Sequence, residues 1–420
     1  MMGRSIEDRL AAAGLPPLPR TAWAEIDLDA LAGNLTILRE LAGPGTPVHP
    51  VVKADAYGHG AVPVARALAA AGADGFCVAS IDEAIALRQA GIEVPILVLY
   101  PIPPAYAAGA ARDGIAVTAG DPALLQGLLG ALVADPPDRT LDVHIEVETG
   151  LGRGGFSGAA LRQAAHLIHI GERTRLAGAW THLQAAEDAL RTARQVEAFE
   201  AETRQLASEI GPLPTHLAAS GGLLLDGVVS LNGVRPGLAT YGLVPDELLR
   251  PGAQQLAAAA AGLRPVLSLH ARPVRVADLP AGTGISYGPT FTTARASRIA
   301  TLPLGYGDGW SRALSNRSVA IVRGTRVPLV GNVAMDAVMA DVTDMTPPWV
   351  GVDDEFVLLG AQGTEQITAA EVAAVRGTNS WEVVTSLAAR LPRVYHAASV
   401  PREIRTLVVD EVDARRSKRP

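Results

Sequence analysis

The first half of the chain alternates short apolar runs with longer segments in which apolar residues recur every three or four positions. The short runs predict buried strands and the longer segments predict amphipathic helices. Predicted strands cover 48–54, 75–80, 94–100, 141–149, 175–183, 215–220 and 231–242, and predicted helices cover 61–72, 81–91, 121–133, 157–171 and about 188–210. Strands that alternate with helices are expected to be parallel. About eight such units predict a closed (β/α)8 barrel of the TIM type, with an open doubly wound sheet as the alternative.

The pattern changes after about residue 262, where β-branched runs separated by turn residues predict a smaller, mainly-β C-terminal domain. One helix, at 379–391, is expected within it. We therefore expect the barrel at 21–262 and the β domain at 263–410. Residues 1–20 are charged and interrupted by prolines, so we expect a loosely attached N-terminus, and residues 411–420 form a short basic tail.

Composition narrows the function classes. The net charge of −7 argues against a general nucleic-acid or membrane binder. The N-terminal segment lacks the apolar core of a signal peptide, and no apolar run is long enough to span a bilayer. The single cysteine, Cys77, excludes an internal disulfide, which fits the reducing cytoplasm.

Lysine occurs only at Lys53 and, in the basic tail, at Lys418. A genome that favours arginine codons explains why other lysines are missing, but it does not explain why Lys53 is kept at the end of a predicted buried strand. Lysine can lose its proton when it is desolvated, whereas arginine cannot. Lys53 is therefore either a structural lysine or the neutral amine of a reaction.

Polar residues gather at the predicted carboxyl ends of the strands, where barrel enzymes place their active sites. They are Lys53, Asp55, Tyr57, His59, Glu146, Glu148, Arg153, His182, Ser220 and Arg235. The set has no carboxylate pair at glycosidase-like positions and no obvious metal cluster, so no metal is predicted. His166 and His169 share a helix face but lack a third ligand, and "GLGRGG" at 150–155 is a weak match to a dinucleotide loop.

Eight segments resemble those of the alanine racemases, which use pyridoxal phosphate and combine an N-terminal barrel with a C-terminal β domain. "VVKADAYGHG" at 51–60 resembles the cofactor-lysine motif of that family. The other segments follow in the family's order: "ETGLGRGG", "WTHL", "NGVRPGLATYG", "GISYGPTF", "LPLGYGDGW", "VAMD" and "NSWEVVTSLAARLPRVY". The resemblance covers roughly residues 21–400.

The resemblance implies two catalytic residues. Lys53 would hold pyridoxal phosphate as a Schiff base and then act as an acid and base. Tyr287 would be the second base, on the opposite face of the substrate. A tyrosine base needs its pKa lowered by cationic neighbours, and His182 would provide such a route by linking Arg235 to Tyr287.

The resemblance also implies a cofactor site. The side chains of Tyr57 and Ser220 and the backbone amides of Gly237 and Leu238 would bind the phosphate. Arg235 would face the pyridine nitrogen and keep it largely unprotonated, which suppresses transamination. Trp381 stands where a phosphate-binding tyrosine is common, and Ala219 stands where an asparagine is usual.

Four residues would contact or admit the substrate. Arg153 would bind the substrate carboxylate and the phenolic oxygen of the cofactor, with help from the Met335 backbone, while Tyr306 and Arg312 would line the entrance. Many relatives carry a carbamylated lysine at the position of Glu146. Glu146 would supply the supporting anion for Arg153, with a bound chloride or Glu148 as the alternatives.

The resemblance implies a homodimer that interconverts L-alanine and D-alanine, shares active sites between subunits and supplies D-alanine for peptidoglycan. A racemase of serine or lysine is the first alternative. A decarboxylase that uses pyridoxal phosphate is disfavoured by "GISYGPTF" and "GYGDG". A non-catalytic carrier of pyridoxal phosphate is disfavoured by the additional β domain.

Overall fold

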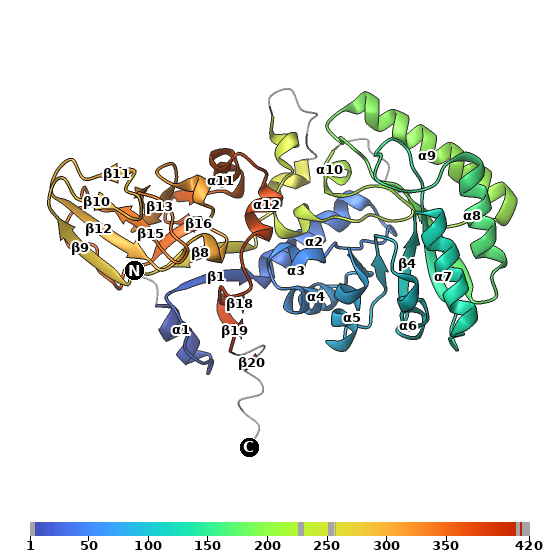
Figure 1. The fold of residues 1–420 in the computed structure, drawn as a ribbon, viewed down its shortest axis with the longest axis horizontal. Coiled ribbons are helices and arrows are strands. Elements are labelled where there is room, and N and C mark those ends of the chain that lie inside the picture. The colour runs from blue at the N-terminus through green and yellow to red at the C-terminus, as the bar shows by residue number, and fades with distance from the viewer. Residues whose placement is uncertain (1–4, 226–230, 251–255, 257, 409–411, 414–420) are drawn as a thin grey trace, which may run out of the picture. The chain divides into compact units, whose positions relative to one another are not determined.

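The computed structural model describes residues 5–225, 231–250, 256, 258–408 and 412–413. The chain forms two compact units (Figure 1). The barrel unit contains residues 31–57 and 61–264, and the β unit contains residues 5–30, 58–60 and those from 265 onward. The predicted basic tail, 411–420, lies outside the described residues apart from 412–413.

Six parallel strands of the barrel unit pair in chain order. They are β2 (Phe76–Val78), β3 (Ile96–Val98), β4 (Ile115–Ala119), β5 (Leu141–Glu146), β6 (Thr174–Trp180) and β7 (Thr215–His216). Parallel bridges from Val51 to Cys77 and from Val48 to Val234 add two extended segments, and a bridge from Ala219 to Arg235 joins the second of these to the β7 side. The ring of six strands and two bridging segments confirms the predicted closed barrel over the open sheet.

Helices surround these strands (Figure 1). The predicted helices appear as α4 (Ala61–Ala70), α5 (Ile81–Gln89), α7 (Pro122–Ala134), α8 (Gly158–Ile170) and α9 (Ala189–Ile210). The sequence pattern did not pick out α2 (Leu28–Ala42), α6 (Ala107–Arg112) or α10 (Ser220–Leu223). None of the helices within the described ranges is long and apolar enough to cross a membrane.

The predicted strand at 48–54 stops before Lys53. Lys53 instead begins α3 (Lys53–Tyr57), in which residues 54–57 all have φ between 52° and 55°. Left-handed helical backbone costs roughly 1–2 kcal/mol per non-glycine residue. Hydrogen bonds hold the turn in place, including those from the Ala54 amide to Glu83 Oε1 (2.6 Å) and from the Ala61 amide to Asp55 Oδ1 (2.8 Å).

The β unit is built around a sheet of twelve strands among the described residues. One of its inner strands is β1 (Ala22–Asp27), which pairs in parallel with β18 (Arg393–Ala397) and antiparallel with β8 (Leu267–Ala271). The predicted boundary at residue 21 is therefore wrong, because β1 finds both partners in C-terminal sequence. The other strands are β9 (Arg275–Leu279), β12 (Ser297–Leu302), β13 (Val319–Val322), β14 (Thr325–Val330), β15 (Val338–Asp341), β16 (Phe356–Gln362), β17 (Glu365–Ile367), β19 (Val400–Arg405) and β20 (Val412–Asp413).

The N-terminal segment is packed, contrary to the prediction of a loose attachment. Helix α1 (Ile6–Ala12) buries Ile6 and Leu10 in a cluster that also contains Trp23, Val394 and Ile404. The two apolar side chains are four residues apart and therefore share one face of the helix. The charged residues of the segment also have partners, since Glu7 pairs with Arg272 and Arg9 pairs with Glu25.

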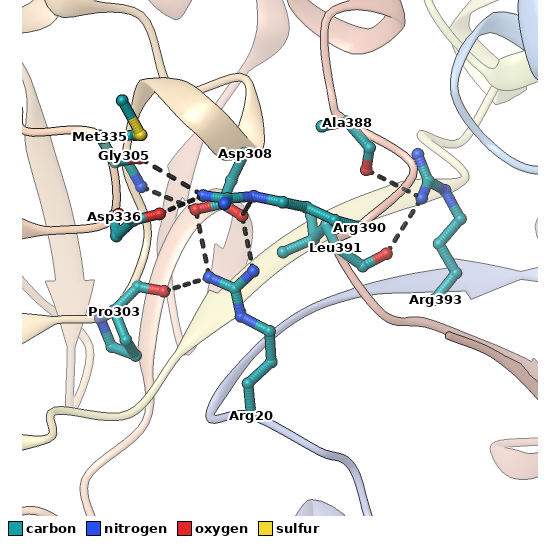
Figure 2. A network of polar contacts seen from close by, with 10 residues as sticks. All are labelled: Arg20, Pro303, Gly305, Asp308, Met335, Asp336, Ala388, Arg390, Leu391 and Arg393. Atoms are coloured by element: carbon teal, nitrogen blue, oxygen red, sulfur yellow. Dashed lines mark hydrogen bonds and ion pairs between the residues drawn. The ribbon is translucent and has the colours of Figure 1, made fainter. Parts of the chain in front are cut away.

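Among the described residues, two α-helices rather than one lie between the C-terminal strands of the β unit. The predicted helix at 379–391 ends at Thr385 as α12 (Ser380–Thr385), and α11 (Ala369–Arg376) precedes it. The buried Arg393 guanidinium donates to the carbonyls of residues 387, 388 and 391. Arg393 thus satisfies these carbonyls in place of the backbone amides of a continued helix. Figure 2 shows the bonds to Ala388 and Leu391.

Candidate active site

The barrel unit places Lys53 where a neutral amine is favoured. The side chain is half-buried in the turn that follows the first extended segment. Burial lowers the pKa of the Lys53 ammonium, the Arg153 guanidinium lowers it further, and Glu83 opposes the shift. A group with these properties at the carboxyl end of a barrel strand suits a nucleophilic amine.

The predicted ion pair between Arg153 and Glu146 is present. The Arg153 Nη2 to Glu146 Oε1 distance is 2.9 Å, and Glu146 is buried at the end of β5. Burial raises the pKa of Glu146 although Arg153 opposes that shift. Glu148 accepts the amides of Gly150 and Gly152 instead. The alternative that Glu148 is the partner of Arg153 is therefore wrong.

Arg235 is 3% exposed and makes its hydrogen bonds without a carboxylate. Its Nη2 donates to the Thr181 carbonyl at 2.7 Å, and its Nη1 contacts Nδ1 of His216. The guanidinium also lies over the Trp180 ring, 4.9 Å from the centroid. Burial lowers the pKa of Arg235 to about 10, so the group remains charged at neutral pH.

The predicted hydrogen-bonded link from Arg235 to His182 is absent from the described part of the barrel. Burial, together with Arg235 and Arg153, lowers the pKa of His182 to about 3, so a neutral His182 stays near these cations without bonding to Arg235. His216 takes the predicted place of His182, and sequence reasoning missed it. The available signal was a histidine in a barrel strand, where interior positions are normally apolar.

The hydroxyls of Tyr57 and Ser220 lie beside the Gly237 backbone. Ser220 Oγ accepts the amides of Gly237 (2.8 Å) and Ala239 (3.1 Å), which leaves the Ser220 hydroxyl proton free to donate elsewhere. A Cβ atom at Gly237 would lie 2.5 Å from Tyr57 Oη, so only glycine allows this approach. Burial raises the pKa of Tyr57, which keeps its phenol protonated. With the Leu238 amide, this cradle of donors fits the phosphate group of pyridoxal phosphate.

The β unit holds Tyr287 on a well-supported loop and leaves the side chain 79% exposed. The loop joins β10 (Gly284–Ile285) to β11 (Phe291–Thr292). Asn332 Nδ2 donates to the carbonyls of Tyr287 and Gly288, each at 2.9 Å.

The other predicted residues of the β unit also lie partly or largely exposed. Tyr306 and Met335 belong to adjacent backbone segments, because the Tyr306 amide donates to the Ala334 carbonyl and the Gly307 amide donates to the Met335 carbonyl. Arg312 is exposed at the start of the 3₁₀-helix Arg312–Leu314. Trp381 is half-buried in the first turn of α12.

Asp308 organises the segments that carry Tyr306 and Met335 (Figure 2). Its carboxylate has no exposed surface and accepts two hydrogen bonds from Arg20, at 2.6 and 3.1 Å, and one from Arg390 Nε at 2.9 Å. Arg390 also donates to the Met335 carbonyl (3.4 Å) and to Asp336 (2.6 Å). Sequence reasoning missed this network because it joins positions almost 300 residues apart.

The described residues contain no group of three or more His, Cys, Asp or Glu side chains that could hold a metal ion.

Comparison with known proteins identifies both parts of the chain. Residues 26–245 match the family described as "Alanine racemase, N-terminal domain", and residues 266–395 match "Alanine racemase, C-terminal domain". An alanine racemase from Symbiobacterium thermophilum is 41% identical over 90% of this chain and 97% of its own length. One from Syntrophobacter fumaroxidans is 38% identical over 89% of this chain and 97% of its own.

Solved structures agree with these matches. The alanine racemase of Bacillus anthracis, determined with bound L-Ala-P, has a TM-score of 0.84 and 34% identity, and covers 94% of this chain and 99% of its own. The alanine racemase of Streptomyces lavendulae, from a D-cycloserine producer, has a TM-score of 0.82 and 34% identity, with coverages of 91% and 98%.

The Asp308 network predicts a large and pH-dependent loss of stability when its charge is removed. Burial alone would raise the pKa of Asp308, but bonds from Arg20, the Gly305 amide and Arg390 lower it below its usual value. We expect Asp308→Asn to cost roughly 3–5 kcal/mol in the free energy of unfolding in urea, because two arginines lose their buried partner.

Asp336→Asn is the matched control, since Asp336 pairs with the same Arg390 but its side chain is 65% exposed; we expect a loss below about 1 kcal/mol. Because the folded-state pKa of Asp308 is lowered, its contribution is complete above the unfolded pKa of about 3.9 and is lost as pH falls through the lower folded value. Equal losses for the two variants at pH 7 would contradict this account.

Proposed function

The chain belongs to the alanine racemase family and therefore interconverts L-alanine and D-alanine, and we propose that it does so with Lys53 and Tyr287 as its two bases. The family depends on pyridoxal phosphate, which, when bound, supplies an electron sink that acidifies the α-carbon of the substrate. One observation carries the proposal. Apart from Lys418 in the basic tail, Lys53 is the chain's only lysine, and it shares one turn with Tyr57, whose hydroxyl lies at the Gly237 cradle.

The residues of the barrel unit divide the binding of cofactor and substrate. The hydroxyls of Tyr57 and Ser220 and the amides of Gly237 and Leu238 would hold the phosphate. Trp381 is the further residue that the family resemblance assigns to phosphate binding. Lys53 would attach the cofactor covalently, which its lowered pKa favours. Arg235 would donate to the ring nitrogen and keep it unprotonated, because a guanidinium does not give up its proton at neutral pH.

Proton transfer needs one base on each face of the substrate. Lys53 removes or returns the α-proton on one face, and Tyr287 does so on the other. Arg153 and the Met335 backbone hold the substrate carboxylate between them, and Tyr306 and Arg312 line the approach. Holding the carboxylate limits rotation of the substrate, so its α-carbon stays between the two bases throughout the reaction.

We infer that Tyr287 works in the active site of a partner subunit, which makes the enzyme a homodimer. The inference is supported by the 79% exposure of Tyr287 together with the four hydrogen bonds that fix its loop through Asn332. We place the reaction in the cytoplasm, where D-alanine is required as a precursor of peptidoglycan.

Replacing Glu146 tests the role of the anion beside Arg153. We expect Glu146→Gln to keep the fold and to lower kcat/KM for alanine roughly tenfold to a hundredfold, which is the effect of losing a charge-assisted hydrogen bond. Activity of the unmodified enzyme should not depend on added bicarbonate or chloride, because Glu146 is a permanent carboxylate. The measurement is racemisation of L-alanine across a range of both salts.

Glu148→Gln serves as the control, since an amide oxygen can still accept the amides of Gly150 and Gly152; its kcat/KM should change by less than about threefold. A Glu146→Gln enzyme with full activity in chloride-free buffer would show that Glu146 has no part in aligning Arg153.

Subunit mixing tests the two bases and the dimer together. Lys53→Ala should lose both racemase activity and the visible absorbance of bound cofactor, whereas Tyr287→Phe should lose activity but keep the absorbance. When the two inactive variants exchange subunits, each heterodimer contains one site with both bases, so about a quarter of the unmodified activity should return. Activity that stays absent after exchange has been demonstrated, for example with differently tagged subunits, would rule out a shared site.

A further inference from the structure

A row of imidazoles connects Arg235 to a cavity at the amino ends of the barrel strands. The cavity has a volume of about 780 Å³. Its outer wall is formed by residues that precede strands, among them Pro47, Pro95, Pro214 and Asn232, and it reaches inward to His144, His216 and Arg235. Arg235 is therefore approached from the carboxyl end by the candidate cofactor site and from the amino end by this cavity.

Two contacts give the row a direction. Arg235 Nη1 contacts His216 Nδ1, and His216 Nε2 lies 3.2 Å from His144 Nδ1. A guanidinium can only donate, so His216 Nδ1 accepts and its proton must be on Nε2. That Nε2–H then donates to His144 Nδ1, which places the His144 proton on its own Nε2. One geometry thus assigns the tautomers of both histidines.

Both histidines are held neutral, as this assignment requires. Burial lowers the pKa of His144 to about 4, with further contributions from the nearby His49 and from Arg235. Burial and Arg235 also lower the pKa of His216 well below its ordinary value. If His216 carried its proton on Nδ1, it would point a second N–H at the guanidinium and the hydrogen bond to Arg235 would be lost.

The local backbone is shaped to admit His144. The pairing of β5 with β6 shifts register between Val143 and His144, which brings Gly178 opposite the imidazole. A Cβ atom at Gly178 would lie 2.7 Å from His144 Nδ1, so any larger residue would displace the acceptor. An irregularity of this kind re-aims a side chain beside an active site.

We propose that His144 is a positioning residue for racemisation, which selects the tautomer of His216 and thereby holds Arg235 as a hydrogen-bond donor toward the ring nitrogen of the cofactor. The proposal rests on the proposed function, in which Arg235 keeps that nitrogen unprotonated. Without His144, the Nε2–H of His216 loses its acceptor, and the Nη1 side of Arg235 is held less firmly although Nη2 still donates to the Thr181 carbonyl.

The expected consequence is a loss of reaction specificity. With Arg235 loosened, Lys53 or Tyr287 would return the proton to the cofactor's carbon more often than it does in the unmodified enzyme. Water then releases pyruvate and supplies its keto oxygen, while the amino group of alanine stays on the cofactor. Transamination therefore rises relative to racemisation, although KM changes little because Arg153 still binds the substrate carboxylate.

Nitrogen NMR of the holoenzyme, with ¹⁵N confined to its nine histidines, reads the tautomers without measuring activity. We expect both His216 and His144 to carry the proton on Nε2 at pH 7. His144→Asn should preserve the His216 signals, since Asn Oδ1 can replace the lost acceptor, whereas His144→Phe should shift them. An unmodified enzyme with the His216 proton on Nδ1 would overturn the proposal, and this test does not depend on the folding of any variant.

The partition between pyruvate formation and racemisation tests the consequence. His144→Phe should raise this ratio about tenfold with KM changed less than about twofold, and His144→Asn should restore it. His169→Phe, at an exposed position of α8, should leave the ratio unchanged.

Arg235→Lys must raise the ratio if the proposed role of Arg235 holds. If Arg235→Lys raises it while a folded His144→Phe enzyme does not, the role of His144 is refuted and that of Arg235 stands; if neither raises it, the proposed function of Arg235 fails.

Discussion

A lysine amine must stay neutral to react, and the barrel unit surrounds Lys53 with conditions that disfavour its charge. Burial is the larger effect and the Arg153 guanidinium adds to it. The Arg153 guanidinium is itself partly buried, so its positive charge needs a neighbouring anion. Glu146, the last residue of β5, is that anion, with its Oε1 2.9 Å from Arg153 Nη2. The candidate catalytic amine, the candidate carboxylate-binding arginine and its supporting anion thus form one electrostatic unit.

Conformational strain is part of the same arrangement. Residues 54–57 adopt left-handed backbone, at a cost of roughly 1–2 kcal/mol each. The turn places Lys53 and Tyr57 on one short segment, with the Tyr57 hydroxyl against Gly237. Such strain persists only where the surroundings fix the conformation, and here the carboxylates of Glu83 and Asp55 accept backbone amides in and just beyond the turn.

Local patterns in the sequence predicted more of the fold than of the site. Apolar periodicity located the barrel and five of its helices, because these depend on neighbouring residues. It placed β1 in the wrong unit and missed the packing of α1, since both depend on contacts with strands more than 200 residues away. The same limit applies to side chains: Glu146 and Arg153 are seven residues apart and their pairing was predicted, whereas His216 and the Arg20–Asp308–Arg390 network were not.

The central claim, that Lys53 carries the cofactor, has an unusually direct test because the chain contains only one other lysine, Lys418. Borohydride reduction of the holoenzyme fixes a pyridoxyl group to whichever lysine binds it, and mass spectrometry of the proteolytic peptides then locates the modified residue. The account predicts one pyridoxyl group per chain, on the peptide that contains Lys53. An active enzyme whose modification lies on Lys418 alone, or on neither lysine, would contradict it.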